Sequence, residues 1–175
     1  MRRVKSGLPK ISLTVILLFA ILGVSSLYAQ GPVKLTGSMK MNSTVIDSII
    51  VGDVDNHLFM ITESKGYNKG TGESNLFDGA RAINLAFIDV VMGSGTQQGY
   101  LKFSKNSSVA HFKWNGNAKT VVDDAGKKST TFEGTFTFTH GTGDYEMIKG
   151  GGTFTGYYTS PTSYIADWEG EYTLE

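Results

Sequence analysis

The chain has 175 residues, a length typical of a single domain. It contains no cysteine, which excludes disulfides, a lipid-modified cysteine and thiolate metal sites. Sixteen basic residues balance sixteen acidic ones. Because the sequence has no basic run, we expect no nucleic-acid partner.

The N-terminal segment has the three-part layout of a secretory signal peptide. Basic residues end at Lys10, an apolar run covers 11–24, and small residues follow at Ser25, Ser26 and Ala29. The run is shorter than the roughly 20 residues that cross a bilayer, and an uncleaved anchor is the alternative. We therefore predict a signal-peptide helix over 1–29 and a single exported domain over 30–175, periplasmic or secreted, with membrane contact only through the signal peptide. Removal of the signal peptide takes away four basic residues. The remaining domain has twelve basic and sixteen acidic residues, a net charge of −4.

The remaining sequence alternates apolar and polar side chains in short stretches separated by glycine-rich turns, a pattern typical of β-strands. The expected strands cover 33–41, 46–51, 58–63, 82–92, 99–104, 110–122, 131–139, 153–159 and 164–174. The first two can form one bent strand, which leaves eight. Short connections pair successive strands as hairpins, and eight strands remove their edges by closing on themselves. We predict an all-β fold, an eight-stranded antiparallel up-and-down barrel, with an open sandwich as the alternative.

An aromatic-x-glycine triplet recurs in four of the late strands. The four copies are Trp114-Asn115-Gly116, Phe132-Glu133-Gly134, Phe154-Thr155-Gly156 and Trp168-Glu169-Gly170. Residues two apart in a strand face the same side, so we interpret the triplets as inward devices that let strands bend sharply. A stacking platform for a sugar or planar ligand is the alternative. So many inward rings are expected to fill the interior and to leave room only for a shallow pocket at the barrel mouth.

Motifs that carry chemistry are missing from the sequence. The glycine-rich segment 141–152 lacks the Gly-Lys-Ser/Thr ending of a phosphate loop, and we interpret it as a turn with one short helical turn that tucks Tyr145 and Ile148 under the barrel end. No partner at metal-ligand spacing accompanies the histidines, which are His57, His111 and His140. Strand alternation places the acidic residues outside. We therefore predict no catalytic residue, no metal and no cofactor.

One region, 64–79, shows no clear strand pattern and is expected to be a loop at a barrel mouth. Long loops in compact domains are commonly functional or mobile. The candidate ligand-binding residues are accordingly placed on this loop and at the mouth, and they are Tyr67, Asn68, Phe77, Asp78 and Tyr100.

The C-terminal third also resembles a known family. Phe132, the run GDYEMIKG over 143–150, FTG over 154–156 and WEGEY over 168–172 are similar to exported bacterial barrel proteins of the allene-oxide-cyclase-like type. Dirigent proteins have a similar glycine-threonine-glycine turn. The resemblance is vaguer upstream, at 76–80 and 99–100. It implies an eight-stranded calycin-like barrel and homo-oligomers, but no catalytic residue of the plant enzymes is carried over to a position in this chain.

Three functions are compatible with these observations. We favour a non-catalytic exported barrel that binds a small hydrophobic ligand or a protein partner. The second is an isomerase or cyclase resembling allene oxide cyclase, in which holding a reactive substrate in one shape does much of the work. The third is a small outer-membrane barrel.

Overall fold

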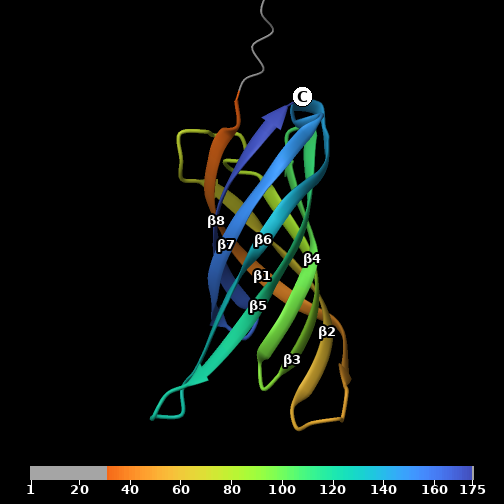
Figure 1. Cartoon of the computed structure of the whole chain (residues 1–175), viewed down its shortest axis with the longest axis vertical. Helices are drawn as coiled ribbons and strands as arrows, with labels where there is room; N and C mark the ends of the chain where they lie inside the picture. The colour runs from red at the N-terminus through yellow and green to blue at the C-terminus, as the bar shows by residue number, and fades with distance from the viewer. Residues whose placement is uncertain (1–30, 175) are drawn as a thin grey trace, which may run out of the picture.

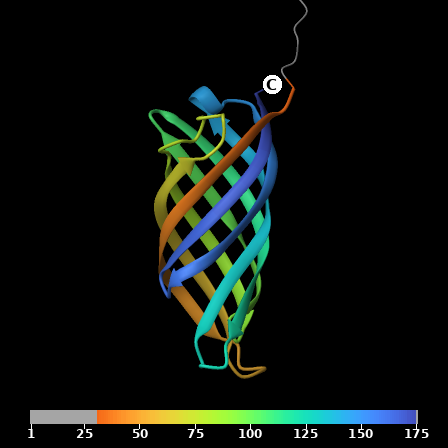
Figure 2. The same ribbon diagram turned by 90° about the vertical axis from the view of Figure 1, so that its left-hand side faces the viewer.

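A computed structural model describes residues 31–174, so the predicted signal peptide lies outside the described residues. Eight antiparallel strands form one closed barrel in which each strand pairs with its neighbours in sequence and β1 pairs with β8 (Figures 1 and 2). The strands are β1 (Val33–Ile50), β2 (His57–Gly70), β3 (Arg81–Val91), β4 (Ser94–Lys105), β5 (Ser108–Val122), β6 (Lys128–Thr142), β7 (Ile148–Ser160) and β8 (Ser163–Leu174). The predicted up-and-down barrel is confirmed. Among the described residues, no helix is long and apolar enough to cross a membrane.

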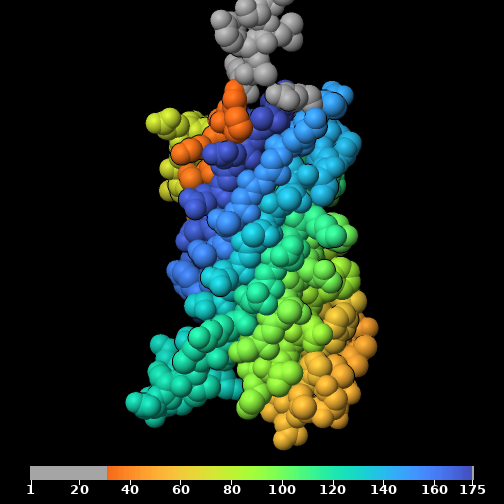
Figure 3. All heavy atoms as spheres, in the orientation of Figure 1, coloured from red at the N-terminus to blue at the C-terminus, as the bar shows by residue number. Residues whose placement is uncertain are grey.

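The barrel has two different ends. At the upper end in Figure 1 lie the β2–β3 loop, residues 71–80, and the short 3-10 helix η1 (Gly143–Tyr145). The β4–β5 turn lies at the same end, because successive strands are antiparallel. At the lower end lie the other four connections, of which the β1–β2 and β5–β6 hairpins project furthest (Figures 1 and 3). As predicted for the segment 141–152, η1 is a single helical turn, and Tyr145 and Ile148 are buried beneath the upper end.

The two expected strands at the start of the domain are one strand, β1, which bends at a bulge between Val45 and Asp47. The prediction for the next segment was wrong in part. Strand β2 continues from the expected 58–63 as far as Gly70, so only 71–80 is a loop. The extension escaped detection because its inward residues are Ser64, Gly66 and Asn68 rather than apolar ones, and the usual alternation of apolar and polar residues is therefore absent.

The ring of each aromatic-x-glycine triplet lies opposite a glycine of a neighbouring strand. Trp168 lies opposite Gly37, Phe154 opposite Gly134, and Phe132 opposite Gly156 in the register of the sheet. Ring and glycine fit so closely that a Cβ added to Gly37 would lie 2.6 Å from the Trp168 indole. Each glycine therefore makes room for an aromatic side chain of the neighbouring strand, which allows a strongly curved sheet to hold large rings inside.

Candidate functional site

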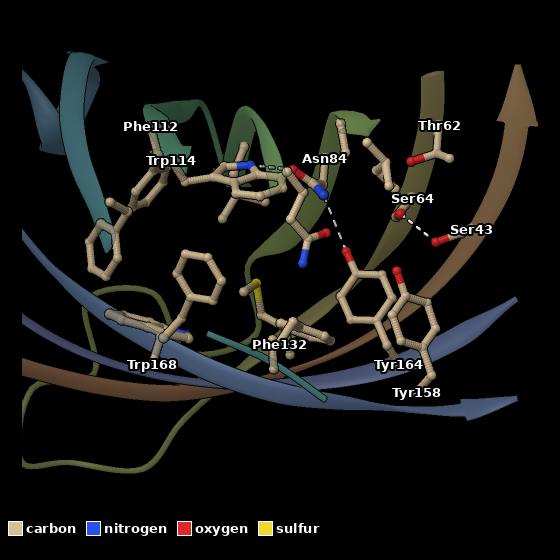
Figure 4. Close-up of a pocket in the computed structure, with 18 of the residues that line it drawn as sticks. Ser43, Thr62, Ser64, Asn84, Phe112, Trp114, Phe132, Tyr158, Tyr164 and Trp168 are labelled. Atoms are coloured by element: carbon tan, nitrogen blue, oxygen red, sulfur yellow. Dashed lines mark hydrogen bonds between the residues drawn. The ribbon is translucent and has the colours of Figure 1, made fainter. Parts of the chain in front are cut away.

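The interior holds a cavity of about 70 Å³, and its lining residues come from all eight strands. One end of this cavity is aromatic, with Phe112 and Trp168, and the other is polar, with Ser43, Thr62 and Ser64 (Figure 4). A space of about 10–15 Å³ is enough for one water molecule, so this cavity has room for a small ring or for several waters. The expectation of a filled interior is therefore wrong in part, because this cavity remains between the inward side chains.

A chain of hydrogen bonds crosses the middle of the cavity. Trp114 Nε1 donates to Asn84 Oδ1 at 2.7 Å, and Asn84 Nδ2 donates to the Tyr164 hydroxyl at 3.3 Å (Figure 4). All three residues are buried and lie on different strands, β5, β3 and β8. Since the Asn84 amide is satisfied on both sides, its orientation is fixed, and the positions of Trp114 and Tyr164 are fixed with it.

Hydroxyl groups gather at the polar end. The Ser43 and Ser64 hydroxyls share a hydrogen bond of 2.7 Å between β1 and β2. Thr62, two residues before Ser64, also faces the cavity, as does Tyr158 from β7 (Figure 4). Ser43 and Tyr158 are only half-buried, so solvent reaches this end of the cavity.

The two tyrosines of the cavity are un-ionised at neutral pH. Burial raises the pKa of Tyr158 to about 12, and the nearby Tyr164 adds to the shift. Burial also raises the pKa of Tyr164, although hydrogen bonds with Ser64 and Asn84 act in the opposite direction. Both phenols are therefore available as hydrogen-bond donors and are poor general bases.

The upper end of the barrel is closed by the Phe77 side chain, which we call the plug. Phe77 from the β2–β3 loop is 1% exposed, and its ring centroid lies between 4.9 and 6.2 Å from those of five aromatic rings. Asn68 holds the plug in place because its Nδ2 donates to the Phe77 carbonyl at 2.9 Å and its Oδ1 accepts from Trp168 Nε1 at 2.8 Å. The Tyr145 hydroxyl donates to the Leu76 carbonyl at 3.1 Å. The loop is therefore an integral part of the barrel.

The five candidate residues from the sequence fall into two groups. Asn68, Phe77 and Asp78 come together at the plug, where the Asp78 carboxylate accepts a hydrogen bond from the Gly70 amide. Tyr67 and Tyr100 lie apart from them on the outer face of β2 and β4, with 67% and 54% of their surface exposed. Of the five, none lines the cavity.

Sequence reasoning missed the polar residues inside the cavity. Thr62, Ser64, Asn84 and Gln97 are buried at inward positions of β2, β3 and β4. In β3 a signal was present, because Asn84 interrupts an inward series that is otherwise Ala82, Ala86, Ile88 and Val90. A lone polar residue at an inward strand position predicts either a hydrogen-bonded partner or a ligand.

Comparisons with known proteins add no function to this site. No family model matches this chain, and no curated protein shows significant similarity to it.

His57 forms a second polar cluster, outside the cavity at the lower end. Its Nδ1 contacts the Asp53 carboxylate in the β1–β2 turn, and its Nε2 contacts that of Asp89 on β3 at 2.7 Å. Hydrogen bonds with Asp89 and Asp53 raise the pKa of His57, and the bond with His57 lowers that of Asp53. Within residues 31–174, no group of three or more acidic or histidine side chains is placed to hold a metal ion.

This cluster predicts a pH-dependent stability. A raised pKa in the folded state contributes stability that is complete below the unfolded value of about 6.5 and is lost as pH rises through the folded value. We expect His57→Gln to lower the melting temperature most near pH 6 and progressively less above it. His111→Gln is the control of opposite sign, because burial, followed by the charges of His140 and Lys102, lowers the pKa of His111. A His57→Gln effect that grows above neutral pH would contradict the assignment.

Proposed function

We propose that this protein is an exported, non-catalytic β-barrel that binds a small hydrophobic ligand in its interior cavity. The observation that carries the proposal is a cavity with aromatic walls and hydroxyl groups at its solvent-facing end. Mostly apolar walls with a few placed polar groups are the usual make-up of small-molecule sites. A fixed Trp114–Asn84–Tyr164 chain supports the same conclusion, because it keeps the walls in place before a ligand arrives.

The test uses p-cresol, a small ring with one hydroxyl, and the tryptophan indole N–H signals in NMR spectra. The chain has two tryptophans, and both line the cavity. We expect p-cresol to shift both indole signals saturably, in the millimolar range or tighter. Because Ala86 is buried in the cavity wall, Ala86→Phe should abolish the shifts, whereas Ala125→Phe in the exposed β5–β6 turn should not. Indole signals that do not respond to p-cresol in the wild-type protein would overturn the proposal.

An isomerase or cyclase resembling allene oxide cyclase is the second candidate. The observation in its favour is that Asn84, Tyr158 and Tyr164 line the cavity. Against it, the lining contains no carboxylate or histidine, and a phenol with a pKa of about 12 is a poor base at neutral pH. Incubation with an apolar extract of the native host separates the candidates. The binding proposal expects the extract's mass-spectrometric profile and isomer composition to stay unchanged.

Two further possibilities concern the outer surface. A protein partner or a second copy would fit the lower end, where the β1–β2 hairpin exposes Val45, Ile46, Ile49, Ile50, Val51 and Val54, and light scattering of the mature protein would report a homo-oligomer. The outer-membrane alternative has less support. The outward faces of β6 and β8 are exposed and carry residues such as Glu133, Asp167 and Glu171, whereas membrane barrels carry an apolar outer band.

A further inference from the structure

The lining of the cavity is uncharged. Its residues include no aspartate, glutamate, lysine, arginine or histidine, and its only titratable groups are Tyr158 and Tyr164. Charged neighbours in sequence point the other way. On β2, for example, Ser64 faces the cavity between Glu63 and Lys65, which strand alternation places on the outer face.

An uncharged lining discriminates against ionised ligands. A carboxylate or an ammonium group that leaves water for an apolar site loses its hydration, and this loss is offset only by an opposite charge or by several hydrogen bonds. The cavity offers no opposite charge. Aromatic faces attract cations, but the hydroxyl end of the cavity holds no carboxylate that would complete a cation site.

The polar end retains free hydrogen-bonding groups. Trp114, Asn84 and Tyr164 are engaged with one another, and Ser43 is engaged with Ser64. By contrast, the hydroxyls of Thr62 and Tyr158 have no hydrogen bond to any of the residues drawn in Figure 4. Tyr158 is the better placed of the two for an incoming ligand, because it is half-buried at the solvent-facing end and its phenol remains protonated.

We infer that the cavity selects neutral molecules that combine an apolar ring or chain with one uncharged oxygen acceptor, and that it rejects carboxylates of the same shape. The acceptor is an alcohol, ketone, ester or amide oxygen that receives a hydrogen bond from Tyr158. The ring lies toward Phe112 and Trp168 at the aromatic end. This inference rests on the proposed ligand-binding function and narrows it to a chemical class.

Two nearly isosteric molecules test the charge selection. 4-Methylbenzamide is neutral and 4-methylbenzoate is anionic at pH 7. Both are titrated into the mature protein while the two indole N–H signals are followed. We expect the amide to bind at least about 10-fold more tightly, equivalent to about 1.4 kcal/mol. 4-Methylbenzylamine, a cation at this pH, should also bind more weakly than the amide.

The possible outcomes distinguish failure of this inference from failure of the proposed ligand-binding function. Equal or tighter binding of the benzoate or of the benzylamine would overturn the neutral class and leave ligand binding in place. If neither these molecules nor p-cresol shifts the indole signals, both the proposed ligand-binding function and the inference are overturned.

A pair of tyrosine variants tests the hydrogen bond. Tyr158→Phe removes the inward hydroxyl, whereas Tyr157→Phe makes the same change on the outer face, where Tyr157 is 48% exposed. We expect Tyr158→Phe to reduce the preference for 4-methylbenzamide over p-xylene several-fold and Tyr157→Phe to leave it unchanged. Binding of p-xylene shows that the Tyr158→Phe cavity is intact. An unchanged preference in Tyr158→Phe would overturn the assignment of Tyr158 as the donor.

Discussion

Replacing Phe77 by alanine is expected to lower the free energy of unfolding by about 3–5 kcal/mol, the usual cost of removing a fully buried phenylalanine ring. Phe77 is 1% exposed and packs against Phe103, Phe112 and Tyr145 among other rings. Small domains are stable by only about 5–15 kcal/mol in total, so this loss is a large share of the free energy of unfolding. Urea unfolding followed by circular dichroism measures the change.

The matched control is Phe87→Ala. Phe87 is on the outer face of β3 and is 36% exposed, so its removal leaves no internal cavity and should cost about 1 kcal/mol or less. The Trp168 indole signal provides a second measurement, because Asn68 links Trp168 to the Phe77 carbonyl, and we expect it to move in Phe77→Ala only. Equal destabilisation by the two variants would show that the β2–β3 loop does not plug the barrel.

Replacing Asn84 by leucine is expected to cost about 2–3 kcal/mol, because the change removes two hydrogen bonds and leaves a buried indole N–H without its acceptor. Leucine has nearly the shape of asparagine, so the loss reports on polarity rather than on packing. The same variant should increase the hydrogen-exchange rate of the Trp114 indole N–H, which donates to Asn84 at 2.7 Å. The Trp168 indole N–H, which donates to Asn68, should be unaffected.

Asn117→Leu is the control for this substitution. Asn117 lies on the exposed face of β5, and its replacement should change the free energy of unfolding by no more than about 0.5 kcal/mol. If Asn84→Leu were as stable as the wild-type protein, the chain of hydrogen bonds would not organise the cavity. The ligand proposal would then lose the fixed walls on which it depends.

Local sequence patterns were sufficient to predict the barrel, because the alternation of apolar and polar residues repeats along the whole domain. Each of β5, β6 and β8 has a regular alternation of rings and polar residues, and short turns leave successive strands no partner other than each other. The upper half of β2 was missed for the opposite reason. Its inward residues, Ser64 and Asn68, are polar and buried only because residues distant in sequence cover them.

The cavity could not be predicted from the sequence, because it depends on contacts between residues that are distant in the chain. Asn84 acquires its role from Trp114, 30 residues away, and from Tyr164, 80 residues away. The residues singled out from the loop were placed correctly near one end of the barrel, but the loop closes that end, and the cavity lies below it.

The sequence alone determined the all-β class, the number of strands and the inward direction of the aromatic rings, because these follow from a two-residue period that each strand carries by itself. Only the tertiary structure decided where the rings leave space. That outcome depends on how Phe77 fills one end and how small polar side chains of β1, β2 and β3 line the other, which are properties of the closed barrel and not of any one strand.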